Sequence, residues 1–378
     1  MLLTLGSDQE YFRDTTARFL AERAPTSRLR QLRHDPAGFV RADWITGCEL
    51  GWTSLLVPEA DGGGSISGEG AVDLSLVAFE FGRHAAPGPL VDCNVAALAL
   101  SGQPGEPHRA ALAELLSGAA IASCCIGAAP WPMTRNVGVE IRREGGDVVL
   151  NGLARPAESA AQAEHLLVTG RTDGRMTQVL VPRETSGVST RPLQNLDVTR
   201  RFAAVAFDDV RLPAAAVLGE VGGADEAFSR QIQAAGVVLA AESVGAMHAA
   251  FEMTVEWAFN RYSFGRPLAS YQALKHRFAD MKSWLEAGHA ISDQAAAAVA
   301  SGSAQAGELV SAARAFVGHY GVELAQDCVQ LHGGIGVTYE HDLHFFLRRV
   351  TLDRTLYGGP ADHRRLIAEM EIEREKAA

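Results

Sequence analysis

Two short stretches carry residue types that suit the binding of a phosphate group. Arg261-Tyr-Ser-Phe-Gly265 places a cation beside a turn between two helices, and a planar guanidinium fits phosphate oxygens well. Gln330-x-x-Gly333-Gly334-x-Gly336 is a glycine cluster, which lets a ligand approach the backbone and its free N–H groups. Either stretch alone is also compatible with an ordinary solvated turn. Their chemistry depends on the elements that bring them together.

Together the two stretches resemble the C-terminal half of the acyl-CoA dehydrogenase family. Arg261 to Leu268, Gln272 and Ala279-Asp-Met281 are similar to the family's Arg-x-x-Phe-Gly…Gln…Ala-Asp-Met pattern. The glycine cluster stands at the usual distance downstream, and Glu340 and Arg348-Arg349 follow it in the place of the family's Arg-Asp. A weaker match, Val205 to Gly219, resembles the end of the family's β domain. The resemblance covers the whole chain in layout, with its specific motifs in the second half.

The resemblance implies an FAD cofactor at an interface with a partner subunit. In the family, the arginine of the first motif reaches the cofactor pyrophosphate of a neighbouring subunit. The positions that match the family's cofactor-binding motifs are Arg261, Phe264, Gln272, Gln330, Gly333 and Gly334.

The positions that would carry the catalytic base lack one. In the family, a glutamate after an aromatic residue removes the α-proton of the acyl thioester, and the matching residue here is Gly358, after Tyr357. Some members carry the glutamate just before an arginine near the start of the first C-terminal helix, and the residue there is Ser229. Asp362 lies close enough in sequence to substitute for it, although an acidic residue at this place also suits a helix start. No catalytic residue is therefore assigned.

The middle of the chain departs from the family at two further places. Ile126 to Met133 stands where the family has Thr-Glu-Pro-x-x-Gly-Ser-Asp near the flavin, and Trp131 there is expected to be a structural anchor. After Asn151-Gly152 the family places a tryptophan that covers the flavin ring, and the alignment puts Pro156 at that position. The chain's own flavin pocket is expected to be eroded.

The hydrophobic pattern predicts an α+β fold, mostly α, like that of acyl-CoA dehydrogenases. A helical domain is expected over residues 1–117, starting at a capping box formed by Ser7 and Glu10. A small antiparallel β domain is expected over 118–224, with hairpin turns at Gly145-Gly146 and Asp173-Gly174. Residues 225–378 are expected to form a C-terminal four-helix bundle, in which Glu242, on an otherwise apolar helix, is paired. The other helices of the first domain are expected near 44–56, 70–81, 90–100 and 110–116.

Composition excludes several classes of function. The formal net charge of −11 over 378 residues argues against nonspecific nucleic-acid binding. No apolar run long enough to span a membrane and no signal peptide is evident, so a cytoplasmic protein is expected. The abundance of Ala, Gly and Arg suggests a bacterial source with a GC-rich genome. The five cysteines, odd in number and without metal-ligand spacing, are expected to be buried and reduced, with no metal site.

The leading hypothesis is a subunit of a heteromeric acyl-CoA dehydrogenase, such as a heterotetramer of steroid side-chain or fatty acid catabolism. The chain would lack the base and complete the FAD site of a glutamate-bearing homologue, with acyl-CoA as substrate and electron-transfer flavoprotein as electron acceptor. One alternative is a homo-oligomeric FAD-dependent dehydrogenase with a relocated base at Asp362. Another is a flavin-free acyl-CoA-binding or scaffold protein. The acyl group is not fixed by the sequence.

Overall fold

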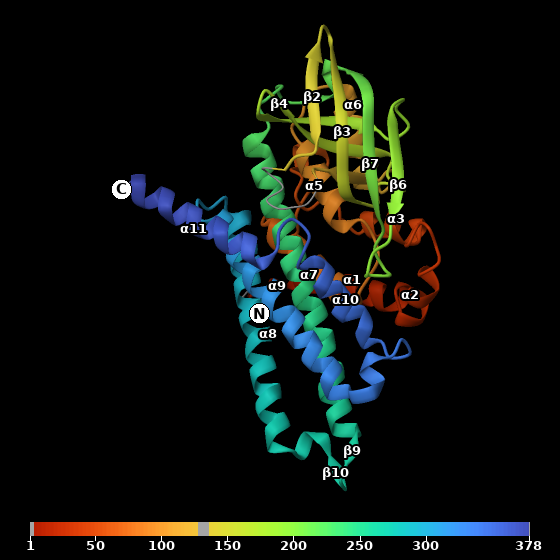
Figure 1. Cartoon of the computed structure of the whole chain (residues 1–378), viewed down its shortest axis with the longest axis vertical. Coiled ribbons are helices and arrows are strands. Elements are labelled where there is room, and N and C mark those ends of the chain that lie inside the picture. Colours follow the sequence, from red (N-terminus) through yellow and green to blue (C-terminus); the bar gives the residue numbers. More distant parts are fainter. Residues whose placement is uncertain (1–3, 128–135, 378) are drawn as a thin grey trace.

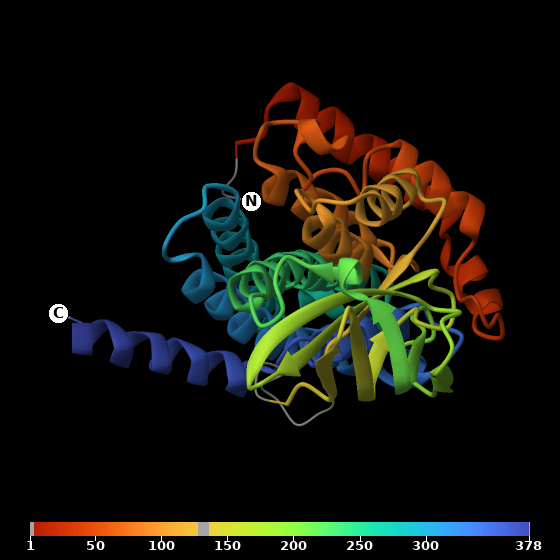
Figure 2. The same cartoon turned by 90° about the horizontal axis from the view of Figure 1, so that it is seen from above.

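The computed structural model describes residues 4–127 and 136–377 and has a layer of helices, a sheet and a bundle of long helices (Figure 1). The N-terminal helices lie along one side of the bundle and the sheet lies at its upper end, as the view from above shows (Figure 2). The N-terminal layer consists of α1 (Ser7–Arg23), α2 (Thr26–Leu32), α3 (Arg41–Glu49), α4 (Gly70–Arg83), α5 (Leu90–Leu100) and α6 (Glu106–Ser117).

The start of α1 differs from the expected capping box. Gly6 is the N-cap, and its N–H donates to Oε1 of Gln9 (3.1 Å), so Ser7 lies inside the first turn. A tertiary contact explains this choice of capping partner, because the Gln9 side chain is buried and its Nε2 donates to Asp73 of α4 at 2.8 Å. This contact across the layer favours Gln9 over Glu10 as the capping partner.

The helix expected over residues 44–56 is also shorter than predicted. α3 ends at Glu49, and the chain turns at Gly51, whose φ of +104° favours glycine. The turn brings Trp52 back onto α3, where a Cβ at Gly47 would lie 2.1 Å from its ring. Packing of this buried tryptophan explains why the helix stops early.

The sheet has eight strands in the order β6-β7-β3-β2-β4-β5-β8, with β1 paired to β4. The predicted hairpin turns are confirmed, since Glu144 pairs with Asp147 and Thr172 pairs with Arg175. The expectation of a purely antiparallel sheet is wrong, because β4 pairs in parallel with both β1 and β2. The strands are β1 (Ala122–Cys125), β2 (Val139–Glu144), β3 (Asp147–Glu158), β4 (His165–Thr172), β5 (Arg175–Pro182), β6 (Val188–Leu193), β7 (Phe202–Pro213) and β8 (Val217–Leu218).

The bundle is built on three long helices that run side by side, α7, α8 and α9 (Figure 1). A small hairpin of β9 and β10 joins α7 to α8 at the end of the bundle away from the sheet, while α10 packs on α7 and α9. The last helix, α11, starts against α9 and projects from the body. The elements are α7 (Asp225–Asn260), β9 (Tyr262–Ser263), β10 (Arg266–Pro267), α8 (Gln272–Ala300), α9 (Ala306–His332), α10 (Leu343–Asp353) and α11 (Pro360–Ala377).

Helix α7 is the most deeply buried of the long helices in the bundle. It is long and apolar enough to pass a composition test for a membrane span, but 83% of its most apolar window is buried inside the protein. Close approach explains part of this burial, since a Cβ at Gly82 of α4 would lie 1.8 Å from the Glu242 carbonyl oxygen. The α4 and α7 backbones therefore meet where Glu242 points into the core.

Candidate functional site

The first motif lies at the exposed end of the bundle. Arg261 directly follows α7 and is exposed, and Phe264 and Gly265 form the turn between β9 and β10 with φ values of +51° and +80°. Phe264 is 97% exposed, so its ring has almost no contact within the chain. Gln272, the first residue of α8, is also exposed, and its amide approaches His276 (3.3 Å). The hairpin thus presents a cation and an uncovered aromatic ring to the exterior.

The glycine cluster ends α9 at the same end of the bundle. Gln330 is exposed, and its carbonyl oxygen accepts the N–H of Gly333, which closes the helix with φ of +64°. A Cβ at Gly333 or Gly334 would meet nothing within 4 Å, so both residues face open space. This backbone is accessible to a ligand or to another chain. Contacts through Trp257 and His332, detailed below, join this motif to Arg261.

The two expected positions of the catalytic base contain no carboxylate. Gly358 has φ of +115°, and Tyr357 before it has φ of +55°, so both residues are in left-handed conformations. Ser229 lies near the start of α7 and is exposed. Asp362 caps the start of α11, because its Oδ2 accepts the N–H of Gly359 (3.1 Å). This geometry matches the helix-start interpretation of Asp362.

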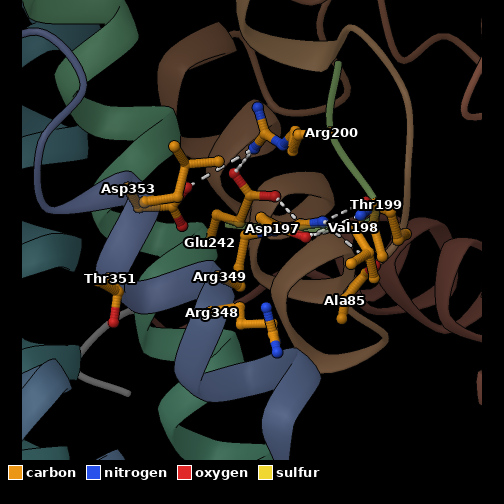
Figure 3. A network of polar contacts seen from close by, with 12 residues as sticks. Ala85, Asp197, Val198, Thr199, Arg200, Glu242, Arg348, Arg349, Thr351 and Asp353 are labelled. Carbon is orange, nitrogen blue, oxygen red and sulfur yellow. Dashed lines mark hydrogen bonds and ion pairs between the residues drawn. The ribbon is translucent and has the colours of Figure 1, made fainter. Parts of the chain in front are cut away.

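A buried ionic network fills the centre of the protein, between the sheet, α7 and α10 (Figure 3). Arg200 Nη1 donates to both carboxylate oxygens of Glu158 (2.6 and 2.8 Å), and its Nη2 donates to Glu242. Arg349 donates to Asp197 (2.8 Å) and to the other oxygen of Glu242. The charged side chains of these pairs are at most 5% exposed. Glu242 is therefore paired on both oxygens, which confirms the expectation for it.

The network connects all three layers of the fold. Glu158 ends β3, while Asp197 and Arg200 lie in the segment between β6 and β7. Arg349 also donates to the carbonyl oxygens of Ala85 and Ala86, between α4 and α5. Sequence reasoning singled out Glu242 as a lone charge in an apolar helix and named Arg349 only as part of a family motif. The partners of Glu242 lie 42 to 107 residues away, so the pattern did not connect them with it.

Burial changes the protonation behaviour of this centre. Desolvation raises the pKa of Asp353, which lies 3.8 Å from Arg200, well above its usual range, and the nearby charge of Glu242 adds to this. Desolvation also raises the pKa of Glu158 against the attraction of Arg200. For Asp197, by contrast, Arg349 and Thr199 outweigh the effect of burial and hold its pKa below the usual value. The network therefore combines ion pairs with a carboxyl that favours its protonated form.

Asp92, a further buried carboxyl, holds the residue that precedes Gly358. Its Oδ1 accepts the hydroxyl of Tyr357 (2.9 Å), and its Oδ2 accepts the backbone N–H of Cys124 (2.8 Å). Burial, with a contribution from the charge of Glu158, raises the pKa of Asp92 to about 7. Tyr357 is thus fixed from the N-terminal layer, and the loop that contains Gly358 is tied to α5.

Pro156 lies beside a cleft rather than against the network. The cleft, of about 340 Å³, lies between this part of β3, the segment after β6 and the end of α10. Two residues further along β3, Glu158 turns into the buried centre. The other predicted departure, Ile126 to Met133 with Trp131, falls largely on residues 128–135, which lie outside the described part of the chain.

The two ends of an FAD molecule fit this chain differently. Exposed Arg261 and the open backbone at Gly333 and Gly334 suit a pyrophosphate. At the ring end, the cleft beside Pro156 is lined by apolar side chains, among them Phe202 and Leu356, but has no tryptophan to cover a ring. The described residues thus fit the phosphate end of the cofactor, while the ring end offers an apolar cleft without the family's aromatic cover.

Comparisons with known proteins agree with this architecture. Residues 6–118 match the N-terminal domain of acyl-CoA dehydrogenases, and residues 224–372 match their C-terminal domain. The helix–sheet–bundle fold with this pair of domains defines the class of acyl-CoA dehydrogenase-like proteins, and the chain belongs to the acyl-CoA dehydrogenase family. The resemblance inferred from the two motifs is confirmed.

The chain is similar to individual acyl-CoA dehydrogenases over nearly its whole length. The acyl-CoA dehydrogenase IpdE2 of Mycobacterium tuberculosis is 29% identical over 370 residues, which cover 97% of this chain and 99% of that protein. The structure of a variant of the Tcur3481-Tcur3483 steroid ACAD superimposes with a TM-score of 0.89 at 24% identity, covering 99% of this chain and all of that one. A glutaryl-CoA dehydrogenase from Mycobacterium smegmatis, solved with FADH2, gives a TM-score of 0.84 at 20% identity, covering 97% and 95%.

Proposed function

We propose that this chain is the base-lacking subunit of a heteromeric acyl-CoA dehydrogenase and completes the FAD site of a glutamate-bearing homologue. The observation that carries the proposal is the contrast between the two halves of the cofactor site. Residues that would serve a cofactor held by another subunit are exposed at the bundle end. The region that would hold the chain's own flavin ring has Pro156 in place of the covering tryptophan and Gly358 in place of the base.

The reaction removes a proton from the α-carbon and a hydride from the β-carbon of an acyl-CoA. When bound, FAD supplies the acceptor for the hydride, and the partner's glutamate supplies the base. This chain would contribute binding and orientation. The N–H groups of Arg261 donate to pyrophosphate oxygens, Gly333 and Gly334 let the cofactor approach the backbone, and Phe264 packs against the partner. Electron-transfer flavoprotein is the proposed electron acceptor, and the cytoplasm the proposed location.

The proposed substrate is a coenzyme A thioester with a bulky, ring-bearing acyl group. The similarity to the Tcur3481-Tcur3483 steroid ACAD supports this class of substrate. Gly358 supports it physically, because a residue without a side chain leaves room at the position where relatives place a glutamate. The four-chain assembly suggested by the sequence remains part of the proposal.

The test is the FAD content per chain, together with the native mass, for the protein expressed alone and with a homologue that carries glutamate at the position of Gly358. We expect little FAD in the chain alone, and a mixed oligomer with fewer flavins than chains. Full occupancy and acyl-CoA turnover by the chain alone would instead support a homo-oligomeric enzyme with a relocated base. Absence of FAD under both conditions would support a flavin-free acyl-CoA-binding or scaffold protein.

A further inference from the structure

The last turn of α7 and the last residue of α9 are joined by stacked rings. Trp257 and His332 lie with ring centroids 5.2 Å apart and planes inclined by only 21°. His341, from the segment before α10, contacts both rings edge-on. Its ring centroid lies 4.5 Å from that of His332 and 6.4 Å from that of Trp257. Residues 75 positions apart in the sequence therefore form one packed cluster under the exposed end of the bundle.

Arg261 is attached to this cluster in two ways. Its backbone N–H donates to the carbonyl oxygen of Trp257 (2.8 Å), which ends α7. Its guanidinium carbon lies 5.8 Å from the centroid of the Trp257 ring, within the range of a cation–π interaction. Trp257 thus restricts the conformations of both the backbone and the side chain of Arg261.

The glycine cluster is attached to the same rings through His332. This imidazole is 4% exposed, and its Nδ1 is hydrogen-bonded to the Cys328 carbonyl oxygen (2.8 Å). A Cβ at Gly336 would lie 2.8 Å from Cβ of His332, so the backbone of the cluster is folded tightly over this residue. Desolvation lowers the pKa of His332, which keeps the imidazole neutral at pH 7 and avoids a second positive charge near Arg261.

We infer that Trp257 and His332 are positioning residues that join the two motifs into one phosphate-receiving unit. Stacking fixes the distance between the end of α7 and the end of α9, and the Trp257 ring restricts the Arg261 guanidinium before a ligand arrives. A long arginine side chain otherwise loses rotamer freedom on binding, so prior ordering strengthens the contact with a pyrophosphate. This inference rests on the proposed function for its ligand, an FAD pyrophosphate held mainly by the partner.

The first experiment measures FAD release from the mixed oligomer for Trp257→Ala, Trp257→Phe, Arg261→Ala and the Trp257→Ala/Arg261→Ala double variant. An exposed cation–π contact corresponds to about a 2- to 5-fold change in affinity, so we expect Trp257→Ala to weaken FAD retention by about that factor. Trp257→Phe keeps a stacking face and should restore most of it. In the Arg261→Ala background, Trp257→Ala should have little further effect, because a positioning residue acts through the arginine.

A matched control is available in the same chain. Trp284 lies under Arg277 in similar geometry, with the guanidinium carbon 4.9 Å from the ring centroid, but on α8, and Arg277 is not among the residues assigned to the cofactor. Trp284→Ala should leave FAD retention unchanged. Additive losses in the Trp257/Arg261 double variant, no rescue by Trp257→Phe, or an equal loss with Trp284→Ala would overturn the inference, because each indicates a general packing role.

A second measurement separates this inference from the proposed function. Inorganic pyrophosphate is titrated calorimetrically into the isolated chain and the same variants. If the mixed oligomer holds no FAD but pyrophosphate binding shows the same dependence on Trp257 and Arg261, the phosphate-receiving unit stands and the proposed function fails. If the mixed oligomer holds FAD, the rates of FAD release from the variants decide whether the inference holds. If neither FAD nor pyrophosphate binds, or if Trp257→Ala matches the wild type in every assay that shows binding, the inference is overturned.

Discussion

The centre of the protein and the end of its bundle both contain arginines, but the two regions use them in opposite ways. At the centre, Arg200 and Arg349 are at most 2% exposed, and each bridges carboxylates from different layers. At the bundle end, Arg261 is exposed and rests on a tryptophan ring, beside a phenylalanine that is almost fully exposed. The central arginines are satisfied within the chain, whereas Arg261 has its donors turned outward.

This difference indicates which arginines are available to bind a further anion. An ion pair in a buried site is expensive to separate once formed, since each ion would lose its compensation away from water. An exposed guanidinium beside open glycine backbone meets a new anion at little desolvation cost. The central ion pairs thus hold the layers of one chain together, while the bundle end is available to a second molecule.

The largest expected effect comes from opening the centre. Arg349→Met leaves Glu242, Asp197 and two backbone carbonyls without their shared donor, and breaking a buried pair in this way costs about 3–5 kcal/mol. We expect a matching loss in the free energy of unfolding measured by urea titration. The neighbouring Arg348→Met removes only a hydrogen bond to the exposed Leu196 carbonyl and should cost about 1 kcal/mol or less. Equal unfolding midpoints for the two variants would contradict the picture of a closed centre.

A second prediction uses pH to sharpen the description of the centre. The pKa of Asp92 is raised to about 7, so the folded chain binds its proton more tightly than the unfolded chain does. The associated stability is fully present below about pH 4 and is lost as the pH rises through 7, with a slope of up to about 1.4 kcal/mol per pH unit. In Asp92→Asn the amide oxygen accepts the Cys124 N–H and the amide N–H donates to the Tyr357 hydroxyl, and the side chain has no proton to lose.

We therefore expect the free energy of unfolding of the wild type to fall between pH 5 and 7.5, and that of Asp92→Asn to fall less steeply. Glu80, whose pKa is also raised to about 7 by burial, accounts for part of the slope that remains. Asp14→Asn, at an exposed position of α1, serves as the control and should follow the wild type. Parallel curves for the wild type and Asp92→Asn would show that Asp92 is ionised in the folded protein throughout this range.

The smallest effect on stability is expected at the bundle end. Phe264 is 97% exposed and loses almost no buried area on truncation, so Phe264→Ala should change the free energy of unfolding by less than about 0.5 kcal/mol. The same substitution should weaken association with the glutamate-bearing homologue by about tenfold, since aromatic anchors contribute strongly to interfaces. Sedimentation velocity of mixed samples measures this. Tyr11→Ala, at a 70% exposed position on α1, is the matched control. Unaltered association of Phe264→Ala would place the partner elsewhere.

Local signals in the sequence were sufficient for much of the fold. The helix expected over 90–100 has those bounds, and the turns at Gly145-Gly146 and Asp173-Gly174 form hairpins, because glycine conformations and apolar periodicity act over a few residues. Errors occurred where a distant contact decided the outcome, as when Asp73 recruits Gln9 at the start of α1. The parallel pairing of β1 with β4 is likewise a property of the whole sheet.

The candidate site divides in the same manner. The motifs around Arg261 and Gly333 are contiguous, so the sequence alone could single them out. The ionic network could not be found in this way, because its members lie far apart in the sequence and no local pattern connects Glu242 with Arg200 or Arg349. Trp257 and His332 were also missed as a pair, because no periodicity connects the ends of two separate helices.

The backbone conformation at Gly358 determines how readily a glutamate could be introduced at this position. An L-residue is strained at φ of +115°, and the loop is held there by the left-handed Tyr357, whose hydroxyl is bound by Asp92. A mutation that changes the Gly358 codon to glutamate would add a carboxylate to the chain without recovering the backbone that aims it. Several residues of the loop and its anchor would have to change together. Under the proposed function, conversion to a self-sufficient enzyme would therefore take more than one substitution, so the chain would stay dependent on its partner.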